Sequence, residues 1–293
     1  MTKNYEVFII GHISKDEIVF KGAKEELIGG AVIYAGCAAA ASGSKIGVLT
    51  KVSEQDKGLL DVFNLPKEDI YCVYSSQTTS IRNEYFSEDR EKRISTALAV
   101  ADPFTMEDLP NVAAKIYYFA GLIAGDFQLT MLENLSGQGR IALDAQGILR
   151  EVEKDGRIVL RDWPLKKKYL PLVDFFKADA VEAEVVTGCS LPHEAARLLH
   201  LWGAKEIMIT QHGKVLVYDG KSFYSQPLKP RNLSGRTGRG DTCFGSYTAR
   251  RLRAGIEESL LFASALVSLK METPGPFRGT TDEVRSYIEQ FYN

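Results

Sequence analysis

Short apolar runs alternate with helical patterns along most of the chain. Residues 5–13 (YEVFIIGHI), 45–52 (KIGVLTKV) and 115–123 (KIYYFAGLI) are apolar almost throughout. Such runs are typical of strands that are buried on both faces of a parallel sheet. Four further runs have the same character, at 140–145, 173–179, 206–211 and 215–220. The alternation predicts a doubly wound α/β fold, with a mostly parallel sheet flanked by helices, in one domain over residues 1–293.

Helices are predicted in the segments between these strands, where the sequence has a helical pattern. The segment 31–41 follows a Gly-Gly turn. The segment 53–63 opens with Ser53 and Asp56 in the spacing of a capping box. The segment 192–203 begins with proline and ends at glycine, as helices often do.

Two segments, approximately 13–29 and 71–100, break the alternation. The first reads as two short strands around Gly22, and the second is polar, β-leaning and rich in Tyr, Thr and Arg. Neither has the continuous apolar character of a central strand. They predict either a small sheet that stands off the main domain as a lid or two long surface hairpins, and sequence alone does not separate these alternatives.

The composition is that of an ordinary globular protein. The 293 residues are 45% hydrophobic and 25% charged, with a net charge of -2, so no general nucleic-acid surface is expected. The four cysteines are scattered, without a CxxC pair or zinc spacing. The N-terminus lacks the features of a signal peptide, and the longest apolar run is too short to span a bilayer. We therefore expect a cytoplasmic protein that binds no membrane.

The stretch SGRTGRGDTCFGSYTARRL, residues 234–252, places glycines before a helix predicted to start near Asp241. The first N–H groups of a helix lack partners and carry partial positive charge. Gly238 and Gly240 let the backbone approach a ligand closely. This combination predicts a phosphate site, at which Asp241 takes a proton from an attacking hydroxyl. By itself, the motif is more often a glycine turn with a capping Asp241, because short glycine motifs match many unrelated turns.

Further motifs give the stretch a context. GRTGRGDTC resembles the C-terminal signature of the PfkB (ribokinase-like) carbohydrate kinases, which is close to D-T-T-G-A-G-D-T-F. Residues 28–56 resemble the N-terminal signature of that family, residues 175–188 its K-P-N-x-x-E-x-E-x-L-T-G segment, and residues 206–220 its strand-Thr-x-Gly-x-x-Gly turn. The four motifs occur in family order and cover nearly the whole chain.

The resemblance implies ATP as phosphoryl donor and Mg²⁺ as cofactor. It implies that Asp241 is the catalytic base and that the N–H groups of Gly238, Arg239, Gly240 and Asp241 form an anion hole for the transferring phosphoryl group.

Other residues take implied roles at three further places. The N-x-x-E positions, which act through Mg²⁺, are occupied by Asp179 and Glu182, with Asp where the family usually has Asn. A nucleotide-binding turn is implied at Thr210 and Gly213, and an acceptor site at Asp16, Gly29 and Gly30.

The chain departs from the family pattern at four positions. Tyr34 replaces an Asn that binds ribose in ribokinases, which disfavours ribose as acceptor. Arg239 replaces an Ala in the anion hole, and its side chain is expected either to reach a phosphate or to point to water. Gly235 replaces the Asp that is tied to potassium activation. Cys243 replaces Phe and is interpreted as a small core residue.

One more run resembles a subgroup of the family that includes myo-inositol kinase-like proteins. It is the D-x-Q-G-x-x-R pattern from Asp144 to Arg150. Arg82 and Arg93, in the polar second segment, are candidates for substrate contact, although lone arginines of this kind are more often solvated.

The expected function is therefore an ATP-dependent kinase of a small sugar or polyol, with myo-inositol or a hexose favoured. A nucleoside or phosphosugar kinase of the same fold and a catalytically weak regulator that binds sugar or nucleotide are the alternatives. With the family resemblance, the segments 13–29 and 71–100 are expected to form a small β lid, and the exposed strand edges of this lid would also allow a homodimer.

Overall fold

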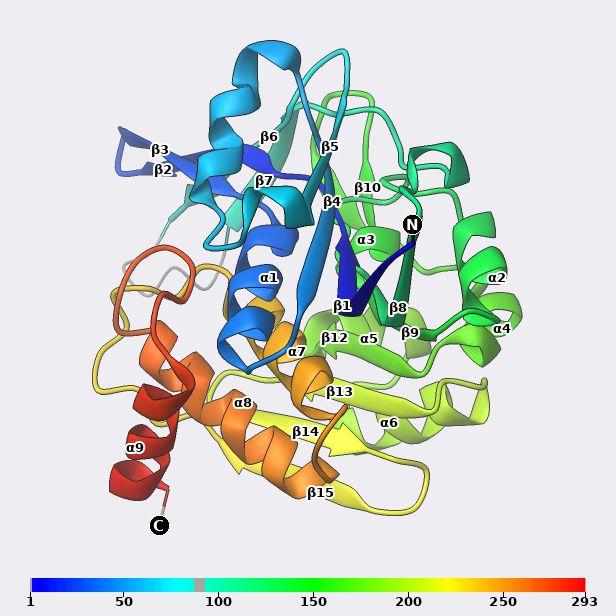
Figure 1. The fold of residues 1–293 in the computed structure, drawn as a ribbon, viewed down its shortest axis with the longest axis vertical. Helices are drawn as coiled ribbons and strands as arrows, with labels where there is room; N and C mark the ends of the chain where they lie inside the picture. The colour runs from blue at the N-terminus through cyan, green and yellow to red at the C-terminus, as the bar shows by residue number, and fades with distance from the viewer. Residues whose placement is uncertain (1, 87–92, 293) are drawn as a thin grey trace.

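A nine-stranded sheet forms the centre of the protein, of which the computed structural model describes residues 2–86 and 93–292 (Figure 1). Its strand order is β15–β14–β13–β12–β9–β8–β1–β4–β5. The seven strands from β13 to β5 are parallel, and β14 and β15 add an antiparallel hairpin at one edge. The strands are β1 Lys3–Ile10, β4 Ile46–Val52, β5 Ile70–Tyr74, β8 Val112–Phe119, β9 Arg140–Asp144, β12 Phe175–Asp179, β13 Glu206–Thr210, β14 Lys214–Tyr218 and β15 Phe223–Pro227.

Helices cover both faces of this sheet, as the doubly wound prediction requires. One face packs against α1 Ala31–Ala41, α7 Arg239–Arg250 and α8 Ile256–Lys270, and α9 Thr281–Phe291 lies on α8. The other face packs against α2 Thr130–Ser136, α5 Ala180–Thr187 and α6 Pro192–Leu201. The short helices are α3 Gln146–Leu149, α4 Lys166–Tyr169, η1 Glu54–Val62, η2 Lys67–Asp69, η3 Met106–Asp108 and η4 Leu170–Leu172. The strand order reverses beside β1, and ligands bind in such sheets at the carboxyl ends of strands near that point.

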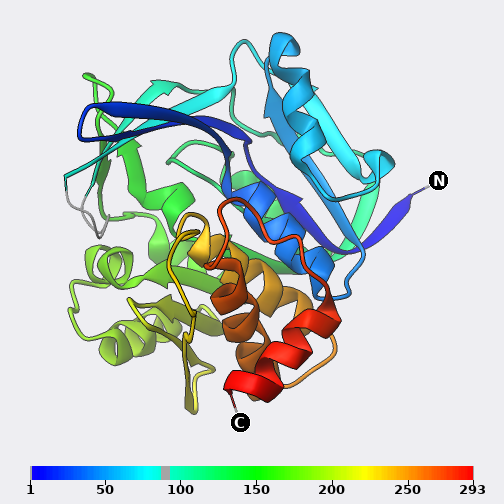
Figure 2. The ribbon, with the colours of Figure 1, turned by 90° about the vertical axis from the view of Figure 1, so that its left-hand side faces the viewer.

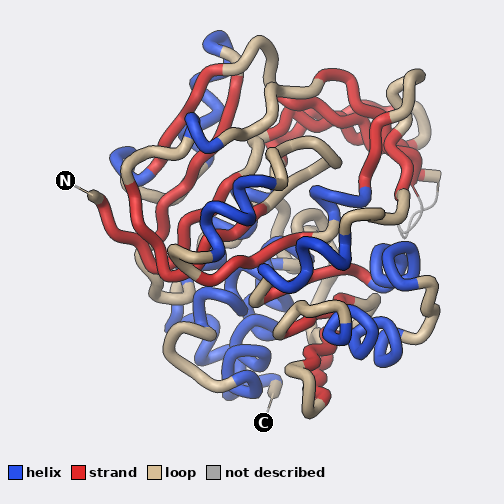
Figure 3. Tube along the Cα trace, turned by 90° about the vertical axis from the view of Figure 1, so that its right-hand side faces the viewer, coloured by secondary structure: helices blue, strands red, loops and turns tan. Residues whose placement is uncertain are grey.

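A second sheet of four strands stands apart from the large one, at the top of the molecule in Figure 2 and separate in the tube of Figure 3. Its order is β3–β2–β6–β7, from β2 Ser14–Phe20, β3 Ala23–Gly29, β6 Thr79–Tyr85 and β7 Arg93–Ala99. A hairpin of β10 Arg150–Val152 and β11 Ile158–Leu160 reaches β7, where the Ala97 N–H donates to the Gly156 carbonyl at 2.8 Å. The two segments that break the alternation therefore form one small sheet.

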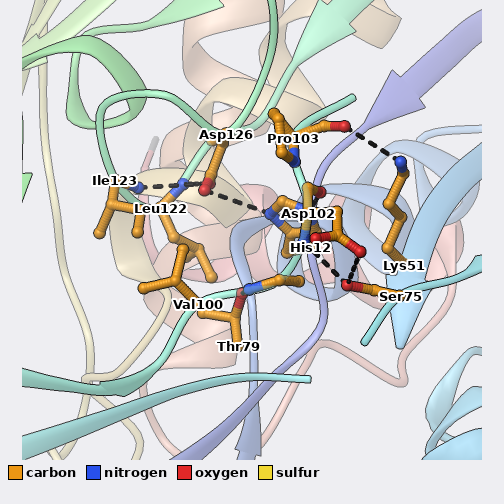
Figure 4. Close-up of polar contacts among 12 residues, drawn as sticks. His12, Lys51, Ser75, Thr79, Val100, Asp102, Pro103, Leu122, Ile123 and Asp126 are labelled. Atoms are coloured by element: carbon orange, nitrogen blue, oxygen red, sulfur yellow. Dashed lines mark hydrogen bonds and ion pairs between the residues drawn. The ribbon is translucent and has the colours of Figure 1, made fainter. Parts of the chain in front are cut away.

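Buried polar contacts fix the small sheet where the chain crosses between the sheets (Figure 4). The His12 Nδ1 lies 3.2 Å from the Asp126 Oδ1, and its Nε2 lies 3.1 Å from the carbonyl of Asp102. The ring of His12 stacks on Phe104, with centroids 4.4 Å apart. The Asp102 carboxylate accepts a hydrogen bond from the Ser75 hydroxyl at 2.9 Å. The segments that join the two sheets, at His12 after β1, at Ser75 after β5 and at Asp102 after β7, are thus tied to the core of the large domain.

Two local predictions need correction. Residues 71–74 belong to β5, which pairs with β4 in the large sheet, so the small sheet is narrower than the predicted segment. Residues 54–62 form a 3-10 run instead of an α-helix, and the Ser53 hydroxyl donates to the Asp56 carboxylate at 2.8 Å without capping a backbone N–H. In the described part of the chain, no helix is long and apolar enough to cross a membrane.

Candidate active site

Several candidate residues meet at the carboxyl edge of the large sheet. Asp144, Asp179 and Thr210 are the last residues of β9, β12 and β13, which are neighbouring parallel strands. In the register of these strands, Lys177 lies opposite Asp144, and Asp179 lies opposite Thr210. The fold thus brings together three sequence motifs that are far apart along the chain.

Lys177 and Asp144 form a buried ion pair at this edge. The Lys177 Nζ lies 3.1 Å and 3.0 Å from the two carboxylate oxygens of Asp144, and the lysine is 5% exposed. Burial alone would lower the pKa of Lys177, but the carboxylates of Asp144 and Glu182 outweigh it and raise that pKa. Burial raises the pKa of Asp144, and the Lys177 cation opposes this effect. Lys177 therefore remains an ammonium at neutral pH.

The first turn of α7 lies directly beside that ammonium. Gly238 is the N-cap, with a left-handed φ of 75°, and the Thr242 N–H donates to its carbonyl at 2.9 Å. A side chain at residue 238 would collide with the ring of Tyr34, so only glycine fits there. Among the described residues, no backbone carbonyl accepts from the N–H groups of Gly240 or Asp241. The Asp241 N–H contacts the carboxylate of its own residue. N–H groups without a backbone acceptor, as at any helix N-terminus, suit a phosphate group.

Asp241 places a carboxylate in the same turn. Burial raises its pKa, and the neighbouring Glu182 carboxylate raises it further, whereas Lys177 and Arg150 lower it. The residue is half-buried, so the carboxylate is not sealed in the core. A carboxylate with a raised pKa at a helix N-terminus is suited to accept a proton from a hydroxyl that attacks a bound phosphoryl group.

Asp179 and Glu182 cap the start of α5 reciprocally. The Asp179 Oδ1 accepts from the Glu182 N–H at 2.8 Å, and the Glu182 Oε2 accepts from the Asp179 N–H at 2.7 Å. Burial raises the pKa of Glu182 to about 7. Each carboxylate retains a second oxygen, and hard oxygen ligands suit Mg²⁺. The described residues contain no group of three or more His, Cys, Asp or Glu that could hold a metal ion, so other oxygen ligands would have to complete a magnesium site here.

Asp16, Gly29 and Gly30 meet where β2 and β3 join the large domain. A side chain at residue 29 would collide with the Asp16 carboxylate, and Gly30 is the N-cap of α1 with a φ of 117°. Burial raises the pKa of Asp16, while Ser14, Arg150 and Arg93 lower it. Among the described atoms, none donates a hydrogen bond to the buried Oδ1 of Asp16. The glycines make room for this carboxylate, and its free oxygen suits a hydroxyl donor.

Of Arg82, Arg93 and Arg150, the last two lie on the acceptor side of the site. Arg150 is 9% exposed, and burial together with repulsion from Arg93 lowers its pKa to about 10. Glu182, Asp16 and Asp241 all raise that pKa, so Arg150 lies near both the acceptor carboxylate and the start of α7. The Arg93 guanidinium donates to the Tyr85 hydroxyl at 3.1 Å. Arg82 points to the outer face instead, where it pairs with Glu17 at 2.7 Å.

Thr210 and Gly213 lie at the turn between β13 and β14. Thr210 is buried, and Gly213 is exposed, with its carbonyl accepting from the Leu228 N–H at 2.7 Å. A side chain at residue 213 would meet no atom within 4 Å, and its φ is not left-handed. Folding therefore does not require glycine at residue 213.

Cys243 belongs to the core, as its interpretation as a small core residue predicts. It is 1% exposed among the side chains that pack α7 on the sheet. Burial raises the pKa of its thiol to about 12, so the thiol stays protonated and unreactive at neutral pH.

Sequence reasoning assigned no role to two lysines of this site. Lys177 is the first residue of the matched K-P-N-x-x-E segment, so its position was a signal that could have found it. Lys270 is the last residue of α8 and is 1% exposed. Its Nζ donates to the carbonyls of Gly235 and Thr237, just before α7. A lone lysine at the end of an apolar helix resembles an ordinary C-terminal residue, so no sequence signal pointed to it.

Comparison with known proteins decides the family. Residues 12–282 match the pattern of the pfkB family carbohydrate kinases. The chain belongs to the pfkB family. It is 30% identical over 254 residues to a cytidine kinase of Thermococcus kodakarensis, which covers 83% of this chain and 87% of that protein. The protein is thus a kinase of the ribokinase-like family, and the predicted fold and family are both confirmed.

Solved structures of this pfkB kinase's relatives include inositol kinases. A pyrophosphate-dependent kinase in complex with a pyrophosphate analogue and myo-inositol is 34% identical, with a TM-score of 0.86 over 96% of this chain and 99% of that one. A pyrophosphate-dependent myo-inositol-1 kinase, converted into a myo-inositol-3 kinase by replacing an Asn and a Ser with Leu, is 33% identical with a TM-score of 0.85 over 98% and 100%. A ribokinase of Arabidopsis thaliana with ribose and ATP shares the fold at 16% identity and a TM-score of 0.76, over 99% of each chain.

Proposed function

We propose that this protein transfers a phosphoryl group to a hydroxyl of a cyclic polyol of the inositol class. The observation that carries the proposal is the polar inward face of the small sheet. On it, the Ser95 hydroxyl donates to the Asn83 Oδ1 at 2.7 Å, and both residues are buried. In the register of the sheet, Asp16 lies opposite Ile81, and Asn83 follows Ile81 by two residues on the same strand. Side chains two residues apart lie on the same face of a strand, so Asp16 and the Asn83–Ser95 pair share one face. A polyol with hydroxyls on every carbon matches such a face of acceptors and donors.

The myo-inositol kinases among the structural relatives favour the same acceptor. In one of them, an Asn and a Ser decide which hydroxyl is phosphorylated. An Asn–Ser pair also lies on the acceptor side of this chain, at residues 83 and 95. Tyr34, in place of an amide, disfavours ribose, and the cytidine kinase relative keeps a nucleoside as the second candidate acceptor.

The proposed reaction uses the acceptor site around Asp16, the Asp241 carboxylate and the N–H groups at the start of α7. Asp16 binds hydroxyls of the acceptor, and Gly29 and Gly30 let the backbone approach it. Asp241 accepts the proton of the attacking hydroxyl. The N–H groups of Gly238, Gly240 and Asp241 stabilise the charge on the transferring phosphoryl group. The Arg239 N–H is a poorer donor for that purpose, because it already contacts the Arg236 carbonyl at 3.3 Å.

Asp179 and Glu182 are the residues that would hold Mg²⁺, through the oxygens that the capping box leaves over. The ion would neutralise charge on the donor phosphates. Because burial raises the pKa of Glu182 to about 7, its negative charge would increase as the pH rises through neutrality. The affinity of the site for Mg²⁺ would increase with that charge.

The donor is either ATP, as the family resemblance implies, or pyrophosphate, as in three structural relatives. Both present a terminal phosphoryl group to the same helix N-terminus. They differ in the adenosine and its α-phosphate, and only ATP would place an adenosine at the turn of Thr210 and Gly213. Replacing Gly213 therefore separates the two donors.

For Gly213→Val, we expect a rise of about tenfold in the KM for ATP and no change in the KM for pyrophosphate. The folded chain has room for a valine at residue 213, so a steric effect would fall on the bound nucleotide alone. Steady-state kinetics with each donor, at saturating acceptor, measure it. Lys221→Ala, in the neighbouring exposed turn, is the control. Equal effects of Gly213→Val on both donors would contradict a nucleotide site at this turn.

The function itself is tested by product formation from a panel of acceptors with ATP or pyrophosphate and Mg²⁺. The panel contains inositols, hexoses, ribose, cytidine and other nucleosides, and phosphosugars, and phosphorus NMR identifies the product. We expect the highest kcat/KM with an inositol. Highest activity with cytidine would establish the nucleoside kinase, and donor binding without turnover of any acceptor would favour the regulator.

The hydroxyl that is phosphorylated is expected to depend on Asn83. Asn83→Leu removes its amide from the acceptor face, and loss of one hydrogen bond lowers kcat/KM for an inositol by a few-fold to about tenfold, since such a bond contributes about 0.5–1.5 kcal/mol. The ratio of phosphorylated isomers, measured by NMR, should change as well. Arg82→Gln, on the outer face of the same strand, should change neither quantity. An unchanged isomer ratio in Asn83→Leu would place the acceptor elsewhere.

The small sheet would act as a lid that excludes water and so prevents hydrolysis of the donor. Among the described residues, the β10–β11 hairpin covers part of the β7 edge, while β3 is an open edge. A homodimer through β3 stays a prediction, which sedimentation velocity would test. A cytoplasmic location and the absence of nucleic-acid and membrane binding also stay predictions.

A further inference from the structure

Lys270 is a buried cation held by backbone carbonyls beside the phosphate site. Its Nζ donates to the Gly235 carbonyl at 2.6 Å and to the Thr237 carbonyl. The same nitrogen lies 5.0 Å from the centre of the Tyr34 ring. Two carbonyl oxygens and an aromatic face are a typical environment for a cation without a carboxylate partner.

These carbonyls belong to the loop that leads into α7. The other contacts of the loop also anchor it to the end of α8, since the Gly235 N–H donates to the Met271 carbonyl at 2.8 Å and the Ser234 hydroxyl donates to the Glu272 carbonyl at 2.6 Å. In a planar trans peptide, the carbonyl and the following N–H point in opposite directions. Because the Thr237 carbonyl points to Lys270, the Gly238 N–H points away from it.

A charge in this place is costly for the folded state. Burial lowers the pKa of Lys270 to about 8, and only the Asp241 carboxylate, among the groups that act on it, raises that pKa. Burying an ammonium without an ion-pair partner destabilises a fold, and an apolar residue of similar length would fill the space at lower cost. Stability alone therefore does not account for a lysine at the end of α8.

We propose that the Lys270 ammonium is a built-in cation of the phosphate site, which holds the Gly235 and Thr237 carbonyls and thereby orients the N–H groups at the start of α7. The Lys270 ammonium also lies close enough to the Asp241 carboxylate for the two charges to interact. Lys270 is thus a positioning residue for the proposed phosphoryl transfer, on which this role rests. A free monovalent cation of suitable size, such as ammonium or K⁺, has the chemistry to replace it.

The test compares Lys270→Ala, which leaves a space lined by carbonyls, with Lys270→Met, which fills that space. Sulfate is the probe, because it is a tetrahedral anion that does not titrate between pH 6 and 10, and calorimetry measures its binding. We expect both variants to lose about tenfold or more in sulfate affinity, and about a hundredfold in kcat where turnover is measured, as for loss of an anion-hole donor. Ammonium chloride, at ionic strength held constant with choline chloride, should restore at least half of the lost affinity in Lys270→Ala and none in Lys270→Met.

Lys166→Ala is the matched control, because Lys166 also donates to a backbone carbonyl, that of Val186 at 2.8 Å, far along the chain from α7. It should leave the sulfate affinity unchanged. Wild-type affinity in Lys270→Ala, or absence of any gain with ammonium, would overturn the proposal. If the wild type phosphorylates no acceptor but the sulfate results are as expected, the proposed function fails and the cation role stands.

The wild-type protein supplies a second measurement in case the variants do not fold. Sulfate affinity should fall as the pH rises from about 8 to 9.5, since Lys270 loses its proton there, above the pH at which Glu182, with a pKa of about 7, gains its charge. The titratable groups that face Lys270 are Tyr34 on α1 and Asp241 on α7, and the pKa of Tyr34 is raised by burial, so the tyrosine stays protonated over this range. Sulfate affinity that is flat from pH 8 to 9.5 would refute the role of the ammonium.

Discussion

Asp241→Asn should lower kcat by about 10²–10⁴-fold while leaving the affinity for the phosphoryl donor within about threefold of wild type. General-base catalysis contributes about this factor, and the asparagine amide cannot accept the proton of the attacking hydroxyl. The helix N-terminus survives the change, because asparagine fits the first turn and the N–H groups of Gly240 and residue 241 remain. Initial rates with the best acceptor, and calorimetry with the donor, measure the two quantities separately.

The pH dependence of the same variant sharpens this prediction. In the wild type, burial raises the pKa of Asp241 above the ordinary value of an aspartate. The base must be ionised, so kcat should fall as the pH drops through that raised pKa. The acid limb should be missing from the residual activity of Asp241→Asn. Asp219→Asn, in the turn after β14, is the control and should keep both kcat and its pH profile. Residual activity with an unchanged acid limb would assign the base to another group.

The sequence contained enough information to predict the large sheet and the start of α7. Strands such as 45–52 are buried on both faces, and their unbroken apolar runs reflect that. Gly238 is required by a local φ of 75° and by the contact with Tyr34, so its signal lies within a few residues of Asp241. Features of this kind are determined by nearby residues and by the periodicity of one element.

Contacts between distant segments were not predictable in the same way. Lys177 and Asp144 are 33 residues apart and meet only because β12 pairs with β9 in a particular register. Lys270 contacts Gly235 across a similar separation, between the end of α8 and a loop. The sequence around each lysine shows no nearby partner, because the partner lies on another element far along the chain. The prediction of an α-helix at 53–63 was wrong, since residues 54–62 form a 3-10 run and the predicted cap, Ser53, contacts the Asp56 side chain instead of a backbone N–H.

Lys177→Met should destabilise the protein by about 3–5 kcal/mol at pH 7, the usual cost of removing one partner from a buried ion pair. The Asp144 carboxylate is fully buried, and without the ammonium its pKa would rise further. The folded variant would then bind a proton that the unfolded chain releases, so its stability should increase as the pH is lowered from about 8 to about 5, more steeply than in the wild type. Urea denaturation at several pH values measures this dependence.

The double variant Asp144→Asn with Lys177→Met separates charge from packing. If the unpaired carboxylate causes the loss, neutralising it should restore at least half of the lost stability at pH 7 and remove the added pH dependence. Lys205→Met is the matched control, because Lys205 pairs with Asp174 at 2.6 Å but is largely exposed, and such pairs contribute about 0–1 kcal/mol. A double variant as unstable as Lys177→Met would contradict the unpaired Asp144 carboxylate as the cause of the loss. The loss would then come from another contact of the ammonium, such as the one with the Glu182 carboxylate at 4.0 Å.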